Sequence, residues 1–448
     1  MSKPSSFRWH QLRPFSLLQR IQKQKNLQNV ISNTGWLFAD RLLRMGVGLF
    51  VGIWIARYLG VKQFGIFSYA SAFVSLFLSV STLGLPSLVI RTLTEEKEEK
   101  NRVLGTTFYL QLLGGFLALI LSVIIISTLE VNNQLMVNMV VVLGAVGIFQ
   151  SFDTIDLWFQ YKVKSKYPVF ARNIAFAIIS VVKIILISLH APLIAFAWAV
   201  LTEVIIGKIS LIFFYKLDGH SIWMWRWSSS LAQKLLRESW PLILSGITIM
   251  IYMKIDQIML GNMMGDKAVG LYSAAVRVSE VFYFIPTAIT TSIAPSIYSS
   301  QSNDSELVFT KKMSQLLRLL CFGAFLIILP MSFFSNQIIL FLFGAEFHSA
   351  GIILAVHIWA SLFVFMGVGT SLWFISQGLS HLSFIMTLIG AILNVILNFI
   401  LIPHYSGLGA AIATVVAYAI AAFLANYILA KTRKIFFLQL KSLLFFLD

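Results

Sequence analysis

Long apolar runs, separated by short polar breaks, occupy most of the chain. Apolar residues make up 58% of the 448 positions and charged residues only 12%, whereas a soluble domain is about 25% charged. A membrane-spanning helix needs about 20 apolar residues to cross a hydrocarbon core about 30 Å thick. Divided at glycine, proline and charged positions, the runs predict twelve such helices, an all-α polytopic membrane protein. The helices are 32–58, 65–90, 103–128, 135–160, 168–190, 192–215, 238–262, 268–298, 309–334, 348–376, 380–402 and 406–430.

Two stretches of the chain, 205 residues apart, align without gaps. GVKQFGIFSYASA (Gly60–Ala72) and GDKAVGLYSAAVR (Gly265–Arg277) share glycine, lysine, serine and alanine at the same relative positions. Each copy falls at the turn between the first and second helices of a six-helix half. Because six is an even number, the two halves keep the same orientation, and pseudo-two-fold symmetry about the membrane normal is expected. In transporters such repeats enclose the substrate path at their interface.

The helix count and the repeat together predict five segments. We expect a basic cytoplasmic N-terminal tail (1–31), an N-terminal six-helix lobe (32–216), a cytoplasmic linker between the lobes (217–237), a C-terminal six-helix lobe (238–430) and a basic amphipathic cytoplasmic tail (431–448). The last segment alternates basic and apolar residues, which is typical of a helix lying on a membrane surface.

The positive charge of the chain is distributed unevenly across the predicted topology. With a cytoplasmic N-terminus, 25 of the 34 lysines and arginines fall in inner segments, three in outer loops and six inside helices. This imbalance follows the positive-inside rule and predicts a multi-pass protein of an inner, or plasma, membrane with both termini in the cytoplasm. It accounts for most of the net charge of +16 through contact with anionic membrane lipids. No nucleic-acid partner is therefore predicted.

The cysteine content limits which cross-links and metal sites the chain can form. Cys321 is the single cysteine of the sequence, which excludes an internal disulfide and any metal site built from several cysteines. We predict no metal and no cofactor. No cleavable signal peptide is expected, because residues 1–31 are basic without a compact apolar core.

Four stretches of the sequence resemble one known family. They are FADRLLRMGVGLFVGIWIARYLGVKQFGIFSYASAF (38–73), KIDQIMLGNMMGDKAVGLYSAAVRVSE (254–280), IPTAITTSIAP (285–295) and SQGLSHLSFIMTLIGAILNVILNFILIPHYSGLGAAIATVVAYAI (376–420). Their order and content are similar to those of the oligosaccharide flippases of the multidrug/oligosaccharidyl-lipid/polysaccharide exporter superfamily. The resemblance implies a V-shaped pair of six-helix bundles that works by alternating access. It also implies transport of polyprenyl-pyrophosphate-linked sugar repeats to the outer leaflet for surface polysaccharide synthesis, with no bond broken and hence no enzyme.

The first predicted helix carries Asp40, Arg41 and Arg44 well inside its apolar run. A charged side chain at the centre of a membrane helix costs about 2.5–3.5 kcal/mol on insertion scales, so it needs a wet cavity or a partner. A pyrophosphate-linked glycan requires such a cavity, and arginine can donate two parallel hydrogen bonds to a phosphate. The alternative is internal neutralisation, because Asp40 lies four residues before Arg44 and can pair with it.

The second half carries a similar group of charges. Lys254 and Arg277 are expected at similar depth on neighbouring helices, with Asp256 and Glu280 close by. The four charges either neutralise one another permanently or form a network in which substrate phosphate or a coupling ion exchanges partners with the carboxylates. Intramembrane ionisable groups favour the functional interpretation.

Lys183 completes the set of candidate cations. It has no carboxylate in its own helix, and Glu203 of the next helix is its expected partner. A second repeat alignment, at an offset of 215, places Lys183 opposite Asn398. The candidate cavity cations are therefore Arg41, Arg44, Lys183, Lys254 and Arg277, with Asp40, Glu203, Asp256 and Glu280 as their charge partners.

Four residues form a candidate coupling-ion site. The resemblance extends to relatives that bind a cation in the C-terminal half, and Asp256, Asn394, Asn398 and Thr414 could supply oxygen ligands of that kind. With a single carboxylate, a sodium site here is expected to be weak or absent. The alternative is that the amides hydrogen-bond helix to helix, which is common in membranes.

Two other polar features are assigned lesser roles. Asp153 and Asp156 resemble a magnesium-binding pair, but a second carboxylate motif is missing, so two hydrated carboxylates near the end of a helix are expected. His357 is expected to be a packed, hydrogen-bonded imidazole rather than a proton carrier.

Three other classes of protein compete with the flippase interpretation. A multidrug antiporter of the same superfamily should have a carboxylate-rich cavity, whereas the charges at mid-depth here have an excess of one cation. A membrane glycosyltransferase or polymerase needs a sizeable catalytic loop, and the longest predicted outer loop, 335–347, carries only Glu346 as a charge. Flippases of lipid-linked peptidoglycan precursors usually carry more than twelve helices. Docking of a polysaccharide polymerase or ligase is left open.

Overall fold

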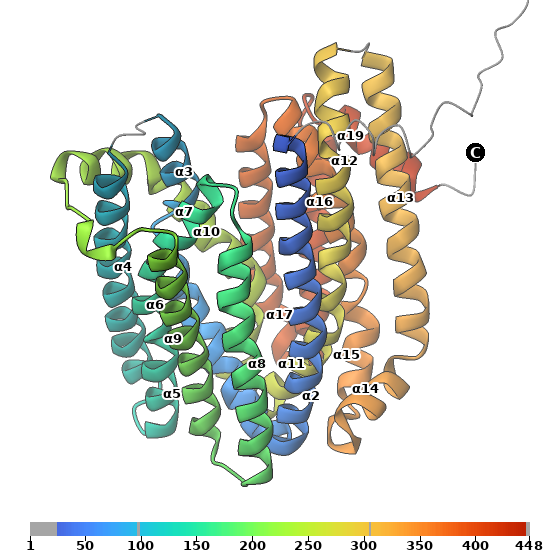
Figure 1. Ribbon diagram of the computed structural model, residues 1–448. Helices are drawn as coiled ribbons and strands as arrows, with labels where there is room; N and C mark the ends of the chain where they lie inside the picture. Colours follow the sequence, from blue (N-terminus) through green and yellow to red (C-terminus); the bar gives the residue numbers. More distant parts are fainter. Residues whose placement is uncertain (1–24, 96–98, 304–305, 445–448) are drawn as a thin grey trace, which may run out of the picture.

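The structure, a computed structural model, describes residues 25–95, 99–303 and 306–444, and these residues fold almost entirely into helices (Figure 1). The first half comprises α2 (Lys25–Ser81), α3 (Pro86–Glu95), α4 (Lys100–Leu129), α5 (Gln134–Gly144), α6 (Val146–Phe149), α7 (Asp153–Tyr161), α8 (Lys166–Ser188) and α9 (Leu193–Leu217). The second half comprises α10 (Ser229–Met264), α11 (Asp266–Glu280), α12 (Phe284–Asn303), α13 (Glu306–Phe333), α14 (Ser335–Phe343), α15 (Ala350–His357), α16 (Ala360–Ser376), α17 (Ser380–Ala419), α18 (Ala425–Ile428) and α19 (Arg433–Leu443).

The predicted count of membrane crossings is confirmed. Ten stretches of the described residues are long and apolar enough to cross a membrane. Two of them contain a long helix that is broken at one non-helical residue, α2 at Gly60 and α17 at Ser406. Each of these two stretches therefore crosses twice, which gives twelve crossings among the described residues. The all-α, multi-pass class predicted from the sequence is what the structure contains.

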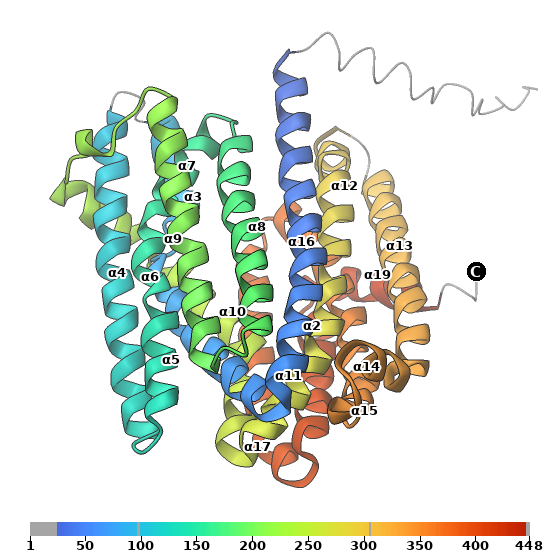
Figure 2. The same cartoon turned by 60° about the horizontal axis from the view of Figure 1, so that its bottom comes forward.

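The two halves stand side by side, and the described chain begins and ends at the same end of the bundle. In Figures 1 and 2, α4 to α9 lie on one side and α12 to α16 with α19 on the other. We call the end where α2 begins and α19 lies the terminal end. The opposite end, with Gly60, Gly265 and Ser406, is the glycine-turn end.

The glycines aligned by the repeat adopt the same unusual backbone conformation. Gly60 has φ 69° and ψ 173°, and Gly265 has φ 81° and ψ 179°. Positive φ with an extended ψ is a region that residues with a side chain avoid. Each glycine therefore lets the chain reverse direction between two helices within one residue. The repeat seen in the sequence is a repeat of this turn.

A second pair of repeat glycines brings the two halves into contact. A Cβ at Gly65 would lie 1.8 Å from the carbonyl oxygen of Asp266, and one at Gly270 would lie 2.1 Å from the carbonyl oxygen of Val61. The two contacts are reciprocal, as a two-fold axis between α2 and α11 requires. No side chain fits at either position, so the halves are packed backbone to backbone at the glycine-turn end.

The segment that connects the two halves, between α9 and α10, is hydrogen-bonded to the first half. The backbone N–H of Arg226 donates to the carbonyl of Asn101 at 3.0 Å, and Arg102 donates to the hydroxyl of Ser228 at 2.8 Å. An ion pair also joins Arg91 of α3 to Glu238 of α10. The terminal end of α10 is thus fixed to α3 and α4.

Helix α19 is docked on the second half. It buries Ile435, Gln439 and Ser442, and the Gln439 amide donates to Thr370 at 2.9 Å while accepting from Asn426 at 3.0 Å. Its amphipathic character, expected for a helix on a lipid surface, therefore also serves packing against protein. The exact boundaries of the predicted lobes, linker and tails stay predictions.

Candidate functional site

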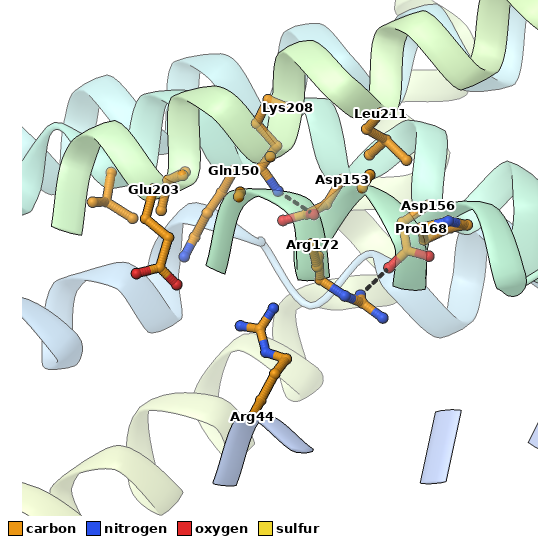
Figure 3. A pocket seen from close by; sticks show the side chains of 14 residues that line it. Arg44, Gln150, Asp153, Asp156, Pro168, Arg172, Glu203, Lys208 and Leu211 are labelled. Atoms are coloured by element: carbon orange, nitrogen blue, oxygen red, sulfur yellow. Dashed lines mark hydrogen bonds and ion pairs between the residues drawn. The ribbon is translucent and has the colours of Figure 1, made fainter. Parts of the chain in front are cut away.

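A cavity of about 250 Å³ lies inside the first half, among α2, α6, α7, α8 and α9 (Figure 3). Its polar lining consists of Arg44, Gln150, Asp153, Asp156, Arg172, Glu203 and Lys208. Three cations and three carboxylates thus face one space within a membrane-spanning bundle. The cavity has no net charge from these groups, so they can neutralise one another.

Arg172 of α8 connects three helices in this cavity. Its guanidinium lies 3.5 Å from the carboxylate of Asp40 on α2 and 3.1 Å from that of Asp156 on α7. Lys208 of α9 pairs in the same way with Asp153. Asp153 and Asp156, to which the sequence analysis assigned a lesser role, therefore each form an ion pair with a basic side chain. Neither Arg172 nor Lys208 was selected from the sequence.

Arg44 is held differently from the other cations of the cavity. Its guanidinium carbon lies 5.5 Å from the centre of the Phe176 ring, a cation–π contact. Asp40, the partner considered for Arg44 from the i,i+4 spacing, pairs with Arg172 instead. In Figure 3 the Arg44 guanidinium points into the cavity toward Arg172. The side chain of Arg41 lies outside the described residues.

Lys183 and Glu203 form the ion pair that the sequence suggested. The Lys183 ammonium on α8 donates to the Glu203 carboxylate on α9 at 2.8 Å. Both side chains are mostly buried, with 13% and 20% of their surface exposed. Glu203 also lines the cavity of the first half, so this pair forms part of the cavity wall.

A second cavity, of about 310 Å³, lies between the halves beside the glycine contacts. It is lined by Lys254 and Gln257 of α10, by Ser273, Arg277 and Glu280 of α11, and by Phe64, Phe67, Ser68, Ser71, Ala72 and Ser75 of α2. Two cations and one carboxylate give it a net positive lining. The packed glycines close it toward the glycine-turn end.

The three charges of this cavity are linked only loosely. Lys254 and Glu280 lie 3.6 Å apart. The guanidinium of Arg277 reaches across to α2, where it lies 3.5 Å from the carbonyl oxygen of Gly52 and over the ring of Phe64 at 5.9 Å. A Cβ at Gly52 would lie 2.4 Å from the guanidinium carbon. The glycine therefore provides the space that Arg277 occupies.

A face of hydroxyl groups lies opposite these charges. Ser68, Ser71 and Ser75 follow one another at spacings of three and four, so they share one face of α2, and all three line the cavity. This serine face was not selected from the sequence, although its spacing is visible there. Hydroxyls both donate and accept hydrogen bonds, as the hydroxyls of a sugar do.

The four residues of the candidate coupling-ion site converge in the second half. One oxygen of Asp256 accepts from the Asn398 amide at 2.6 Å. The other accepts from the hydroxyls of Thr414 at 2.6 Å and Tyr272 at 2.7 Å. Asn394 accepts from Asn398 at 3.0 Å. Tyr272 is the member that the sequence analysis missed.

This cluster is buried and its hydrogen bonds are incomplete. Asp256 is 3% exposed, and Asn394 and Asn398 are fully buried. The amide nitrogen of Asn394 and the amide oxygen of Asn398 have no partner among the described residues. The groups bonded to Asp256 are neutral, and a carboxylate in such surroundings requires a compensating proton or cation. The cluster therefore has the negative charge and one spare oxygen atom, Oδ1 of Asn398, to hold one.

His357 is buried and hydrogen-bonded, as predicted. Its Nδ1 lies 2.6 Å from the Ser279 hydroxyl, and its ring meets that of Tyr272 edge-on, with the ring centres 5.8 Å apart. The imidazole thus packs directly behind the cluster around Asp256.

The described residues form twelve crossings in two halves, with charged cavities within and between them, which is the architecture of a polytopic membrane protein of the transporter type. Solved structures agree on the fold. An inward-facing transporter of the multidrug-resistance MATE family superposes with a TM-score of 0.74 at 15% identity, over 89% of this chain and 96% of that one. The lipid II flippase MurJ in an inward closed conformation gives a TM-score of 0.67 at 19% identity, over 92% and 91%.

The chain belongs to the polysaccharide biosynthesis protein family, whose sequence profile matches residues 30–301. The MatE profile also matches residues 241–400. Among curated proteins, the probable flippase AglR of Haloferax volcanii is 27% identical over 417 residues, which cover 88% of this chain and 82% of the relative. The capsular polysaccharide biosynthesis protein CapF of Staphylococcus aureus is 24% identical over 167 residues, 37% of this chain and 42% of the relative. The resemblance noted in the sequence is thus confirmed at the level of the family.

Proposed function

We propose that the protein is a flippase that moves polyprenyl-pyrophosphate-linked oligosaccharides from the cytoplasmic to the outer leaflet of the inner, or plasma, membrane. Its terminal end faces the cytoplasm in this proposal, and its glycine-turn end faces outward. The family membership and the similarity to AglR support the flippase function. The observation that carries the proposal is the cation- and serine-lined cavity between the halves.

The cavity between the halves has the chemistry that such a substrate needs. A pyrophosphate requires fixed donors with positive charge, which Lys254 and Arg277 supply. The serine face of α2 offers hydroxyl oxygens that can accept hydrogen bonds from the first sugar, since the hydroxyls of Ser71 and Ser75 donate to carbonyls of their own helix. At about 310 Å³ the cavity is at the lower end of the roughly 300–1,000 Å³ range of small-molecule sites. It therefore accommodates the pyrophosphate end of the substrate, while the glycan extends toward the terminal end.

The charge partners have a switching role in this proposal. Glu280 lies 3.6 Å from Lys254, and the substrate pyrophosphate displaces this carboxylate from the lysine. Arg44 and Lys183 with Asp40 and Glu203 line the path in the first half, which the lipid-linked headgroup passes on entry. No chemical bond changes in this cycle, so the proposed activity is transport.

We propose further that the cluster around Asp256 binds the coupling ion, a sodium ion or a proton. Asn394, Asn398 and Thr414 supply neutral oxygens around the single carboxylate. One negative charge matches one monovalent cation, so weak, reversible binding is expected. Asp256→Asn keeps the size of the side chain and removes its negative charge, while its amide NH2 replaces one of the two oxygens that accept hydrogen bonds. It should leave the protein folded and abolish the dependence of flipping on sodium or pH gradients in proteoliposomes.

The test of the flippase function uses a strain that lacks the gene. The polyprenyl-linked oligosaccharide accessible from each face of the membrane is measured after adding back wild type or Arg277→Gln. Lys267→Gln makes the same charge change at an exposed position in the first turn of α11 and is the matched control. Loss of charged hydrogen bonds worth about 1.5–3 kcal/mol should slow flipping by roughly 10- to 150-fold, whereas the control should behave as wild type.

A multidrug antiporter remains the second candidate, because the MatE profile matches residues 241–400. That function predicts a different result in the same strain. The lipid-linked oligosaccharide would not accumulate on the cytoplasmic face, and the cells would become sensitive to cationic drugs. This outcome would refute the flippase proposal.

A further inference from the structure

A line of polar residues runs along one face of α17 to the cluster around Asp256. Ser380, Ser383 and Thr387 are followed by Gly390 and then by Asn394 and Asn398, always at spacings of three or four, which keeps them on one helix face. Ser380 is exposed, Ser383 and Thr387 are half-buried, and the last three are buried. At 1.5 Å per residue the line is about 27 Å long. We call it the α17 polar line.

Two neighbouring cavities accompany the exposed part of this line. One, of about 350 Å³, is lined by Ser245, Ser371, Ser380, Ser383 and Thr387 among others. The next, of about 210 Å³, shares Ser383 and Thr387 with it and extends to Tyr252 and Tyr418. Because the two cavities share lining residues, they follow one another from the terminal end toward the cluster. Hydroxyl groups line both, so water can enter them.

An aromatic pair blocks the line at Gly390. The rings of Tyr252 and Tyr418 are stacked, with centres 4.3 Å apart and planes at 25°. A Cβ at Gly390 would lie 2.8 Å from the Tyr252 ring and 2.7 Å from the Ala421 methyl group. The ring of Tyr252 therefore occupies the position where the polar line would otherwise continue.

Both tyrosines are placed one helical turn from the cluster. Tyr252 precedes Asp256 by four residues on α10, and Tyr418 follows Thr414 by four residues on α17. Since these segments run in opposite directions through the bundle, both rings lie on the terminal-end side of the carboxylate. The pair thus separates the two cavities from the buried cluster.

The backbone beside this pair is irregular. The turn that follows Tyr418, Ile420–Leu424, is a π-helix, a wider turn that is frequent at functional sites. Its extra residue loosens the hydrogen-bond ladder next to the aromatic ring, so Tyr418 sits at a point where the helix can readjust.

We infer that the α17 polar line is the path by which a monovalent cation or a proton reaches Asp256 from the terminal end, with Tyr252 and Tyr418 as its gate. This inference rests on the coupling-ion site proposed above. Movement of the Tyr252 ring away from Gly390 would join the hydroxyl-lined cavities to the partnerless amide atoms of Asn394 and Asn398. The gate keeps the ion site closed to the terminal end in the conformation described here.

The test measures how fast a small cation reaches each side of the gate. The full chain in nanodiscs, with Cys321→Ala, carries one reporter, either Thr387→Cys before the gate or Asn394→Cys beyond it. The probe is methanethiosulfonate ethylammonium, a water-soluble cationic thiol reagent. We expect Thr387→Cys to react quickly and Asn394→Cys slowly. If the gate is open in roughly 0.1–10% of molecules, its removal by Tyr252→Ala should accelerate the reaction of Asn394→Cys on the order of tenfold or more.

Two matched variants separate a gate from a general loosening of the bundle. Tyr252→Phe keeps the stacked ring and should leave the Asn394→Cys reaction slow. In the chain that retains its native cysteine, Tyr252→Ala should not expose Cys321, which is buried on α13 away from the path. If Asn394→Cys does not fold, Ala391→Cys on the same buried stretch serves as the reporter.

The inference is overturned if Tyr252→Ala leaves the reaction beyond the gate unchanged, or if it exposes Cys321 equally. The reaction rates require no transport, so they are independent of the coupling proposal. If the gate behaves as expected but Asp256→Asn keeps its dependence on sodium and pH gradients, the path stands and the coupling role of Asp256 fails.

Discussion

Substitution of Gly65 tests how the glycine-turn end is closed. In the described conformation a Cβ at this position would lie 1.8 Å from the carbonyl oxygen of Asp266, while ordinary contacts begin at 3.4 Å. Gly65→Ala therefore requires α2 and α11 to separate by about 1.6 Å locally, and the obstacle is backbone rather than a flexible side chain. The variant should favour the conformation that is open at the glycine-turn end.

The size of the shift follows from the cost of overpacking. An extra methyl group in a well-packed contact typically costs about 1–3 kcal/mol, and each 1.4 kcal/mol changes an equilibrium tenfold. Gly65→Ala should thus shift the ratio of open to closed molecules by roughly 5- to 150-fold. Gly270→Ala, which meets the carbonyl of Val61 at 2.1 Å, should have a similar effect. Because the two glycines flank one crossing, the double variant should shift the ratio by less than the product of the two.

The assay is a distance measurement between spin labels at Lys62→Cys and Lys267→Cys in a chain with Cys321→Ala. Both lysines are exposed at the glycine-turn end and occupy equivalent positions in the repeat. Gly65→Ala should transfer population from short to long distances. Gly46→Ala is the matched control, because it lies on the same helix with nothing within 4 Å of its Cβ. An unchanged distance distribution in Gly65→Ala, or the same change in Gly46→Ala, would refute the reasoning.

Two further substitutions test the charged cavities. Arg172→Gln leaves Asp40 and Asp156 without their shared cation. Because the Arg172 side chain is 36% exposed, the free energy of unfolding should fall by about 1–2 kcal/mol rather than by the roughly 3–5 kcal/mol of a fully buried ion pair. Thermal unfolding in detergent should show a larger drop for it than for Arg44→Gln, and equal drops would argue against the Arg172 bridge. Gly52→Ala should displace the Arg277 guanidinium and slow flipping while stability changes little, since that side chain is flexible. Gly48→Ala, with its nearest contact at 3.9 Å, should flip normally, and a Gly52→Ala variant that also flips normally would remove Arg277 from the proposed site.

The sequence predicted the features that depend on position along the chain. The lengths of the apolar runs determine the crossings, and the offset of 205 residues places Gly60 and Gly265 at equivalent turns. The set Asp256, Asn394, Asn398 and Thr414 was expected from the family resemblance, and the spacing of four residues places the two asparagines on one helix face.

Pairing between helices was predicted less well, for a physical reason. A helix in lipid can be apolar on every side, so its hydrophobic pattern does not fix its rotation about its own axis. The spacing of Asp40 and Arg44 suggested a pair within one helix, but the orientation of α8 brings Arg172 to Asp40 instead. The contact between Tyr272 and Asp256 could not be predicted from the sequence for the same reason.

The reciprocal glycine contacts have a consequence for the history of the chain. Gly65 meets the other half at Asp266, and Gly270 meets the first half at Val61, which is the pattern of a symmetric dimer interface. A six-helix ancestor that paired with a copy of itself would have made both contacts with a single glycine. After fusion, neither glycine could diverge alone, because the space for each is limited by the backbone of the opposite repeat.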